Sequence, residues 1–222
     1  MSKAILWDFD GTLSYPNQAF FSALHTAIRE YGYQLCPELS AAFLQSAYSW
    51  KNPEFSYVLQ DWWQVMHKKV SEFCLNNHVQ ACHIGGVCER FRQLLIDISN
   101  YQLYPDTISV LKQCWELGFE NYIATNNYPE ITENIHKLGL KPYINGCIVS
   151  AHIGFEKPRI EFYRAALDLA PHALYMVGDN PIADIQGAQA MGLHTIAVHS
   201  CTNSTAEYYC QTLSDILPIL KT

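Results

Sequence analysis

The chain has 222 residues, of which 49% are hydrophobic and 16% are charged, and its formal net charge is -7. This length suits one large domain, or a core with a second module inserted, and the hydrophobic fraction can fill a sizeable core. An acidic chain lacks the excess of Lys and Arg that nucleic-acid binding or a polybasic membrane contact requires, so we expect neither partner.

The sequence predicts a cytoplasmic protein. No apolar run approaches the ~20 residues of a membrane span. Lys3 is followed by strand-like residues, so we expect no secretory signal. The eight cysteines are scattered without a paired framework, which favours reduced thiols over disulfide bridges. The sequence carries no signal for an oligomeric state.

The N-terminal elements are a short strand and a long helical stretch. Residues 4–7 form an apolar run that ends at a polar cluster, as buried strands do. Residues 17–99 then show apolar positions at helical spacing and little strand character. The four helices that we expect there cover residues 19–28, a segment that begins at Pro37, residues 54–75 and residues 87–98.

Beyond residue 105 the pattern alternates between helices and strands. We expect helices over 106–115, 129–138, 160–169, 182–191 and 213–220, and strands over 122–125, 146–149, 173–177 and 193–198. Such alternation implies right-handed crossovers and a parallel sheet. The sequence therefore predicts an α/β fold with a Rossmann-like parallel sheet core, formed by residues 1–14 and 100–222, and an α-helical module inserted at 15–99.

Polar side chains gather where the predicted strands end. The segment Asp8–Thr12 follows the first strand, Thr125-Asn126 ends the second, and Gly178-Asp179 ends the fourth, with Asp184 five residues later. Lys157 precedes a predicted helix. Ligands of open α/β sheets bind outside the carboxyl ends of the strands, so we expect these side chains to face one site.

The chemistry of this set indicates a magnesium-dependent reaction on a phosphate. Alternation along an extended segment puts Asp8 and Asp10 on the same side, and these carboxylates would repel Asp179 without a cation. Hard oxygen ligands of this kind favour Mg²⁺. Lys157 and the Thr125 hydroxyl can bind phosphate oxygens. A carboxylate nucleophile can then form an aspartyl-phosphate that water hydrolyses.

The four motifs, in this order, resemble those of the phosphatases in the haloacid dehalogenase superfamily. The resemblance covers the whole predicted core. It implies that Asp8 is the nucleophile and Asp10 the general acid and base, and that Thr125 and Lys157 are the catalytic residues of the second and third motifs. The inserted module at 15–99 takes the position of the family's helical cap, a lid over the site.

The same resemblance implies Mg²⁺ as the cofactor. Its ligands would be Asp8, the backbone carbonyl of Asp10 and Asp179, with Asp184 as a further ligand or as a residue that supports one. The residues predicted to contact the substrate phosphate are Thr12, Asn126, Asn127 and Lys157. Arg159, beside the third motif, is a further candidate for substrate contact, or pairs with an acidic neighbour.

Asp10 and Thr12 discriminate between members of this family. Dehalogenases lack the second aspartate, because they have no leaving alcohol to protonate. Mutase-like members usually carry Val where this chain has Thr12. The sequence therefore favours hydrolysis of a small phosphorylated metabolite. Two alternatives stay open: a phosphosugar mutase with the same site, and a non-catalytic protein that binds a phosphate ligand.

Each motif on its own also has a structural explanation. Asp10-Gly11 and Gly178-Asp179 are turn signals, and Lys157 suits a solvated helix start. Their joint occurrence in the family's order favours the functional interpretation.

Two other features of the predicted cap are weaker signals. A Cys/His group suggests zinc by its closeness in sequence, but it lacks a C-x-x-C pair, and a helix explains it better; its members are Cys74, His78, Cys82, His83 and Cys88. Trp62 and Trp63 are adjacent, so on a helix they face different directions, and we expect most such aromatics to fill the core of the cap.

Overall fold

A computed structural model provides the structure of the protein, and it describes residues 3–47, 61–199 and 205–221. Its centre is a parallel sheet of six strands in the order β3-β2-β1-β4-β5-β6. The strands are β1 (Lys3–Trp7), β2 (Phe119–Thr125), β3 (Gly146–Val149), β4 (Ala173–Gly178), β5 (His194–Val198) and β6 (Tyr208–Cys210). The predicted α/β fold with a parallel sheet is confirmed.

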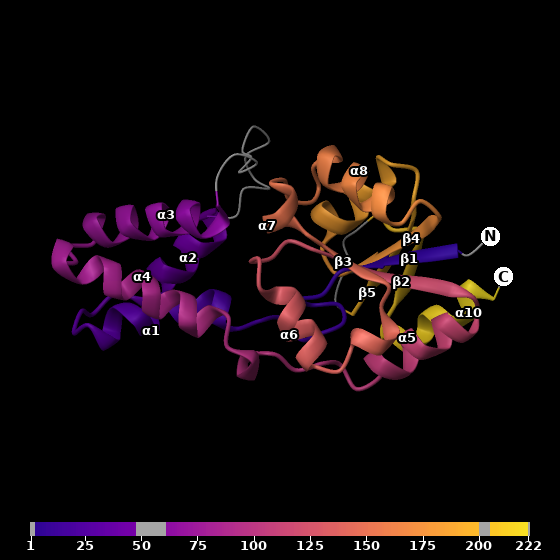
Figure 1. The fold of residues 1–222 in the computed structure, drawn as a ribbon, viewed down its shortest axis with the longest axis horizontal. Coiled ribbons are helices and arrows are strands. Elements are labelled where there is room, and N and C mark those ends of the chain that lie inside the picture. The colour runs from indigo at the N-terminus through magenta and orange to yellow at the C-terminus, as the bar shows by residue number, and fades with distance from the viewer. Residues whose placement is uncertain (1–2, 48–60, 200–204, 222) are drawn as a thin grey trace.

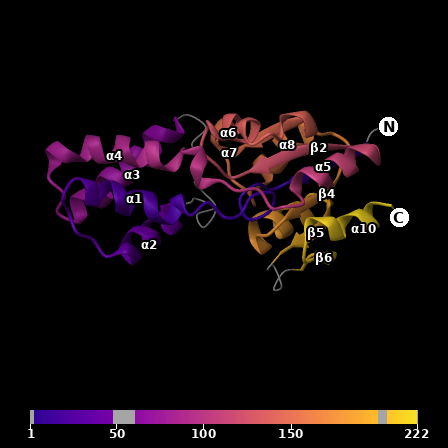
Figure 2. The same ribbon diagram turned by 90° about the horizontal axis from the view of Figure 1, so that it is seen from below.

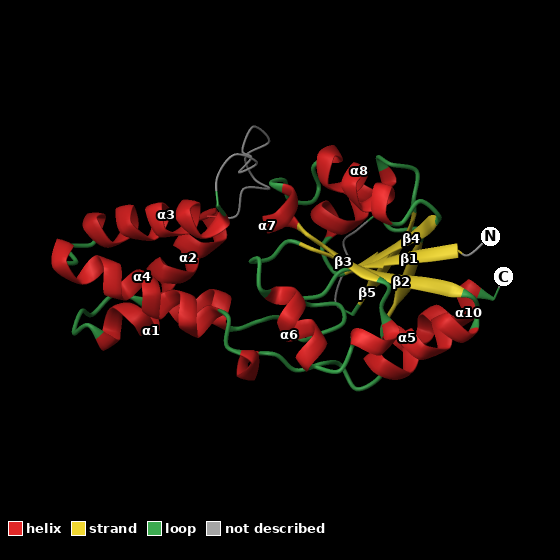
Figure 3. Ribbon diagram, in the orientation of Figure 1, coloured by secondary structure: helices red, strands yellow, loops and turns green. Residues whose placement is uncertain are grey.

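Helices cover both faces of the sheet (Figures 1 and 3). One face carries α5 (Thr107–Glu116), α6 (Ile131–Lys137) and α10 (Leu217–Leu220), and the other carries α7 (Ser150–Ile153), α8 (Ile160–Leu169) and α9 (Gly187–Gln189). Alternate residues of β1 belong to different core clusters: Ile5 and Trp7 pack on the α5 side, and Ala4 and Leu6 on the α8 side. The period of two along a strand therefore builds three layers.

Four helices of the inserted segment lie together at the end of the molecule toward which the strands point (Figures 1 and 2). They are α1 (Ala19–Glu30), α2 (Pro37–Ala47), α3 (Trp62–Asn76) and α4 (Ala81–Leu95). Apolar residues at helical spacing, such as Leu24 and Ile28 of α1, are fully buried between them. We call α1–α4 the cap. The division of the chain at residues 15 and 99 stays a prediction.

Most predicted elements lie where expected, with differences at short or irregular ones. Of the helix predicted over 54–75, residues 54–60 lie outside the described residues, and α3 begins at Trp62, where the Asp61 carboxylate caps it by accepting from the Gln64 N–H. The helix predicted over 87–98 begins earlier, at Ala81, because Ile84 already joins its buried face. Residues 182–191 form a π-helical turn, Pro181–Gln186, followed by α9 instead of one α-helix.

Among the α-helices and strands that the structure describes, two were not predicted. They are α7, with four residues, and the edge strand β6, with three. Both are too short for a hydrophobic period to be visible in the sequence. None of the helices in the described part of the chain is long and apolar enough to cross a lipid bilayer.

One buried polar side chain ties three parts of the core together. Asn121 lies in the middle of β2 and is fully buried. Its Oδ1 accepts from the Trp7 indole at 3.0 Å, and its Nδ2 donates to the backbone carbonyls of Leu111 at 2.9 Å and Tyr143 at 3.0 Å. The Asn121 amide therefore satisfies polar groups of β1, of α5 and of the 3₁₀ helix Lys141–Tyr143 that precedes β3.

The substitution Asn121→Leu keeps a similar volume but leaves the indole and both carbonyls without this partner. Each unsatisfied buried group costs about 1–3 kcal/mol, so we expect the free energy of unfolding to fall by about 3 kcal/mol or more. Chemical denaturation measures the difference. The control Asn76→Leu, at an exposed position, should change the free energy of unfolding by less than about 0.5 kcal/mol. Equal stability of Asn121→Leu and wild type would contradict this role.

Candidate active site

The turn after β1 positions the first motif. Gly11 has a φ of 90°, and the N–H groups of the following residues fold back onto the Phe9 carbonyl, with Leu13 at 3.0 Å and Ser14 at 2.9 Å. A Cβ at Gly11 would overlap the carboxyl group of Asp179. Glycine is therefore needed here both for the positive φ and for the close approach of Asp179.

The strand order places the motifs side by side at the same edge of the sheet. Trp7, the last residue of β1, pairs with Ile123 of β2 on one side and with Val177 of β4 on the other. The N–H of Asp8 donates to the Val177 carbonyl at 2.9 Å. The residues that follow β1, β2 and β4 consequently meet at the carboxyl edge of the sheet.

Lys157 joins two of the carboxylates. Its Nζ lies 2.6 Å from Asp8 Oδ1 and 2.6 Å from Asp184 Oδ1, and its side chain is only 2% exposed. Burial alone would lower the pKa of Lys157, but the negative charges of Asp184 and Asp8 outweigh it and hold the pKa above its ordinary value. The ammonium group therefore stays charged and fixes both carboxylates in place.

Asp8, Asp179 and Asp184 form a compact group of carboxylates. One oxygen of each lies within 4.8 Å of the others. Burial, followed by the charges of Asp8 and Asp184, raises the pKa of Asp179 to about 8. Burial also raises the pKa of Asp184 to about 6, although Lys157 opposes the shift. One ammonium cannot balance three carboxylates, so these residues fit a hard divalent cation bound by oxygen.

Asp10 has different surroundings from Asp8. Its Oδ2 accepts from Asn127 Nδ2 at 2.6 Å. Burial, followed by the charge of Asp8, raises the pKa of Asp10 to about 7. A carboxyl group with a pKa near neutrality can both give and take a proton, which a general acid and base requires.

The residues at the end of β2 contact both the third motif, at Lys157, and the first motif, at Asp10. Thr125 is buried, and its Oγ1 lies 3.4 Å from Asn127 Nδ2. Asn126 accepts from the Lys157 backbone N–H at 2.7 Å and donates to the Lys157 carbonyl at 3.0 Å. The Asn126 amide therefore fixes the backbone of Lys157, while Asn127 holds Asp10.

All residues predicted for the site lie at this edge of the sheet, and their roles stay predictions. They are Asp8, Asp10, Thr12, Thr125, Asn126, Asn127, Lys157, Asp179 and Asp184. The Thr12 hydroxyl lies 3.4 Å from Asp8 Oδ2 and 3.5 Å from Asp179 Oδ1, at the limit of a hydrogen bond. Arg159 pairs with Glu161 at 2.8 Å.

The Cys/His group of the cap is not assembled as a cluster of ligands within the described ranges. Cys74 and Cys88 are buried between α3 and α4, and the Cys88 thiol lies 3.6 Å from the Ser71 hydroxyl. Cys82 is exposed, and His83 Nδ1 lies 2.8 Å from the Tyr33 hydroxyl.

Several residues of the site were not predicted. The Tyr163 hydroxyl donates to the carbonyls of Ala183 at 2.7 Å and Asp184 at 3.0 Å, and the Asn180 N–H donates to Asp184 Oδ2 at 2.9 Å. His199 Nε2 lies 2.9 Å from the Thr12 carbonyl. Asn180 stands inside the fourth motif and could have been noticed there, whereas Tyr163 and His199 carry no signal in the sequence.

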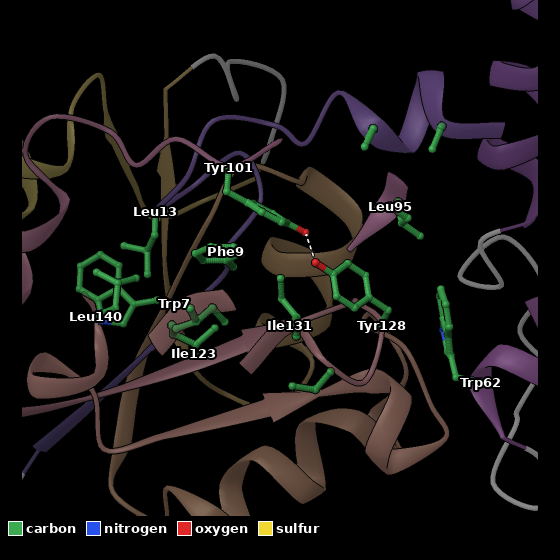
Figure 4. Packing of buried hydrophobic residues seen from close by; sticks show 14 of the residues in the cluster. Trp7, Phe9, Leu13, Trp62, Leu95, Tyr101, Ile123, Tyr128, Ile131 and Leu140 are labelled. Carbon is green, nitrogen blue, oxygen red and sulfur yellow. Dashed lines mark hydrogen bonds between the residues drawn. The ribbon is translucent and has the colours of Figure 1, made fainter. Parts of the chain in front are cut away.

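The cap contacts the core beside the site. Trp63 of α3 donates through Nε1 to both carboxylate oxygens of Glu130, at 3.0 and 2.9 Å. Arg92 of α4 contacts Glu130 at 2.5 Å, and its guanidinium group lies over the Trp63 ring at 4.8 Å. Trp62 faces Tyr128 across the same boundary, with ring centroids 6.5 Å apart (Figure 4). Helices α3 and α4 of the cap therefore both contact the loop that follows β2.

Comparison with known proteins agrees with this fold and site. The family model of the haloacid dehalogenase-like hydrolases matches residues 2–192. The chain therefore belongs to the haloacid dehalogenase-like hydrolase family, and the resemblance drawn from its motifs is confirmed.

Two curated relatives are named phosphatases. A ribulose-1,5-bisphosphate 5-phosphatase of Halopiger xanaduensis is 29% identical over 219 residues, which cover 93% of this chain and 88% of the relative. A phosphoserine phosphatase of Thermus thermophilus is 31% identical over 122 residues, or 51% of this chain. That match spans about half (49%) of the length of the Thermus protein.

A solved structure shares the whole fold. The HAD-hydrolase YfnB of Bacillus subtilis, bound to magnesium, superposes with a TM-score of 0.78 at 21% identity, covering 100% of this chain and 99% of YfnB. At this identity the likeness establishes the fold, and chemistry must be argued from the residues themselves.

Removing Lys157 should destabilise the protein in a pH-dependent way. Lys157→Met leaves Asp8 and Asp184 buried without their cation, so we expect a loss of about 3–5 kcal/mol at about pH 8. The pKa of Asp184 is already raised with Lys157 present, and losing the cation raises it further. At about pH 5 the folded variant therefore protonates Asp184 and should lose less stability.

Chemical denaturation of the wild type and Lys157→Met at both pH values measures this difference. Lys112→Met removes an exposed lysine and serves as the control. The same loss of stability at both pH values would contradict the electrostatic account.

Proposed function

We propose that this protein is a Mg²⁺-dependent phosphatase that hydrolyses the phosphate monoester of a small metabolite through an aspartyl-phosphate on Asp8. The observation that carries the proposal is the pair of aspartates in one turn. Asp8 is bound by Lys157, and Asp10 is bound by the neutral amide of Asn127. A phosphate ester has a leaving alcohol that needs a proton, and a residue placed like Asp10 can supply it. The named phosphatases among the relatives support the same reaction class.

The first step forms a bond between Asp8 and phosphorus. Lys157 binds Oδ1 of Asp8, whereas Oδ2, among the residues that the structure describes, has only the long contact with Thr12, so we assign the attack to Oδ2. As the bond from Asp8 to phosphorus forms, the ester P–O bond breaks, and Asp10 donates its proton to the departing oxygen. Lys157 and the Thr125 hydroxyl stabilise charge on the phosphoryl oxygens.

The second step releases Asp8. Asp10, now a carboxylate, takes a proton from water as that water attacks phosphorus, which frees Asp8 and inorganic phosphate. When bound, Mg²⁺ supplies positive charge against the phosphoryl oxygens. Asp8, the Asp10 carbonyl and Asp179 would hold the ion, with Asp184 as a further ligand or a support.

The cap contributes by excluding water. The contacts of Trp63 and Arg92 with Glu130 hold α3 and α4 against the loop after β2. A closed cap strengthens the electrostatic interactions in the site and keeps the aspartyl-phosphate from premature reaction. On this proposal the substrate is small enough to lie under the cap, and a cytoplasmic location remains an expectation from composition.

Two other functions would use the same residues. A phosphosugar mutase would return the phosphoryl group from Asp8 to a sugar, and a binding protein would hold a phosphate ligand without turnover. Thr12 favours the phosphatase over the mutase, because mutase-like members of the family usually carry Val at this position. The complete set of Asp8, Asp10, Lys157 and Asp179 favours an enzyme over a binding protein, because losing one of them is the simplest route to inactivity.

Phosphate release from a panel of phosphorylated metabolites tests the proposal. We expect turnover that depends on added Mg²⁺ and is concentrated on a few compounds. Asp8→Asn should abolish this turnover, by at least about a thousandfold, because it removes the nucleophile. Asp168→Asn changes an exposed aspartate of α8 and should leave turnover unchanged.

The other outcomes separate the alternatives. An isomerised sugar phosphate formed in preference to free phosphate would indicate the mutase. Tight binding without turnover by folded, metal-loaded protein would indicate the binding protein. Substantial activity of Asp8→Asn would contradict the assignment of the nucleophile.

A further inference from the structure

His199, the first residue after β5, has an unusual backbone conformation. Its φ is 58°, in the left-handed region that few residues other than glycine adopt. Its N–H donates to the Cys210 carbonyl of β6 at 3.0 Å, which holds the backbone in this conformation. Backbone strain of this kind is costly and is found most often at functional sites, so the contacts of the His199 side chain indicate what it does.

The imidazole ring of His199 is held from two sides. Its Nε2 lies 2.9 Å from the Thr12 carbonyl. A carbonyl oxygen only accepts, so Nε2 carries a proton and donates it. The ring also stacks on Tyr104, with centroids 3.8 Å apart and planes inclined by 18°. Both contacts together fix the direction of the N–H group toward Thr12.

Tyr104 joins His199 to the two segments that connect the cap with the core. It packs on Tyr15, with ring centroids 4.0 Å apart; Tyr15 precedes the cap in the chain and Tyr104 follows it. The backbone N–H of Tyr104 donates to the Leu13 carbonyl at 3.1 Å. Burial, followed by the charge of Asp179, raises the pKa of Tyr104, which is consistent with a ring close to the carboxylate group. The aromatic support of His199 therefore borders the site.

Thr12 extends the contact from His199 to two carboxylates. It is fully buried, and among the residues that the structure describes, His199 is the only hydrogen-bond donor to its carbonyl. Its hydroxyl lies 3.4 Å from Asp8 Oδ2 and 3.5 Å from Asp179 Oδ1. Ionised carboxylates only accept, so the single hydroxyl proton is shared between them. A shift of the Thr12 peptide would therefore move this hydroxyl relative to both carboxylates.

We propose that His199 is a positioning residue for the Mg²⁺ site. By donating to the Thr12 carbonyl, it keeps the Thr12 hydroxyl between Asp8 and Asp179 and so limits how far these two carboxylates can move apart. This inference rests on the proposed function, which takes both aspartates as ligands of the ion. It also accounts for a strained histidine after β5, where glycine would relieve the strain but could not donate.

Two substitutions separate the donor from the ring. His199→Phe keeps a ring that can stack on Tyr104 but lacks the donor, whereas His199→Gln keeps an N–H donor of similar reach but lacks the ring. Calorimetry without substrate measures the affinity for Mg²⁺. We expect His199→Phe to bind Mg²⁺ about tenfold more weakly, because one buried acceptor loses its donor, and His199→Gln to stay within about threefold of the wild type.

His78→Phe is the matched control, because His78 also has a left-handed φ, of 61°, and is exposed after α3 in the cap. It exchanges the same side chains at a similar backbone conformation and should keep the wild-type affinity for Mg²⁺. If chemical denaturation shows that His199→Phe does not fold, His199→Ala replaces it, since it lacks both donor and ring and should weaken binding by about the same factor.

The comparison of these variants decides the role of the donor. Wild-type affinity in the variants that lack the donor would overturn the proposal. An equal loss of affinity in His199→Gln would contradict it as well, because the ring would then matter and the N–H group would not.

Metal binding separates this inference from the proposed function. If the wild type hydrolyses no phosphate ester but the variants show the expected affinities for Mg²⁺, the phosphatase proposal fails and the role of His199 stands. If the wild type is an active phosphatase and His199→Phe binds Mg²⁺ as tightly as the wild type, the phosphatase proposal stands and the role of His199 fails. A folded wild type that binds no Mg²⁺ would refute both the metal assignment and the role of His199.

Discussion

The buried contacts of Lys157 with Asp8 and Asp184, both 2.6 Å long, are the constraint around which the site is arranged. Each partner in this ion triple is fixed from a different element. Asn126 at the end of β2 binds the backbone of Lys157, and the Asn180 N–H binds Asp184. The arrangement requires β2, β1 and β4 to be neighbours in a parallel sheet, because only then do their carboxyl ends converge.

The two aspartates of the first motif have different local surroundings, which suit the two roles that we propose for them. Asp8 contacts the Lys157 ammonium group at 2.6 Å, and we propose it as the nucleophile. Asp10, two residues away, contacts an amide, and burial raises its pKa to about 7. Pairs of titratable groups whose surroundings differ in this way are typical of acid and base assignments in enzymes. The cap lies close to these surroundings, since Trp63 and Arg92 bind Glu130, next to the loop that carries Asn127.

The sequence predicted the parallel sheet, the cap helices and the set of charged residues, because each depends on local patterns: alternation, helical spacing and polar residues at strand ends. It could not give the strand order or the edge strand β6, which depend on pairing between distant segments. The same limit explains what was missed around the site. Asn126 was predicted to bind phosphate, but its contact with Lys157 joins residues 31 positions apart. Glu130 and Trp63 are 67 positions apart, and neither belongs to a motif.

The central claim is that Asp8 becomes covalently phosphorylated. Rapid quenching during turnover, followed by borohydride reduction of the acyl phosphate and peptide mass spectrometry, tests it directly. Reduction of an aspartyl-phosphate yields homoserine, and the account predicts homoserine at position 8 alone, dependent on substrate and absent from Asp8→Asn. Homoserine at another aspartate, or none while phosphate is being released, would contradict the account.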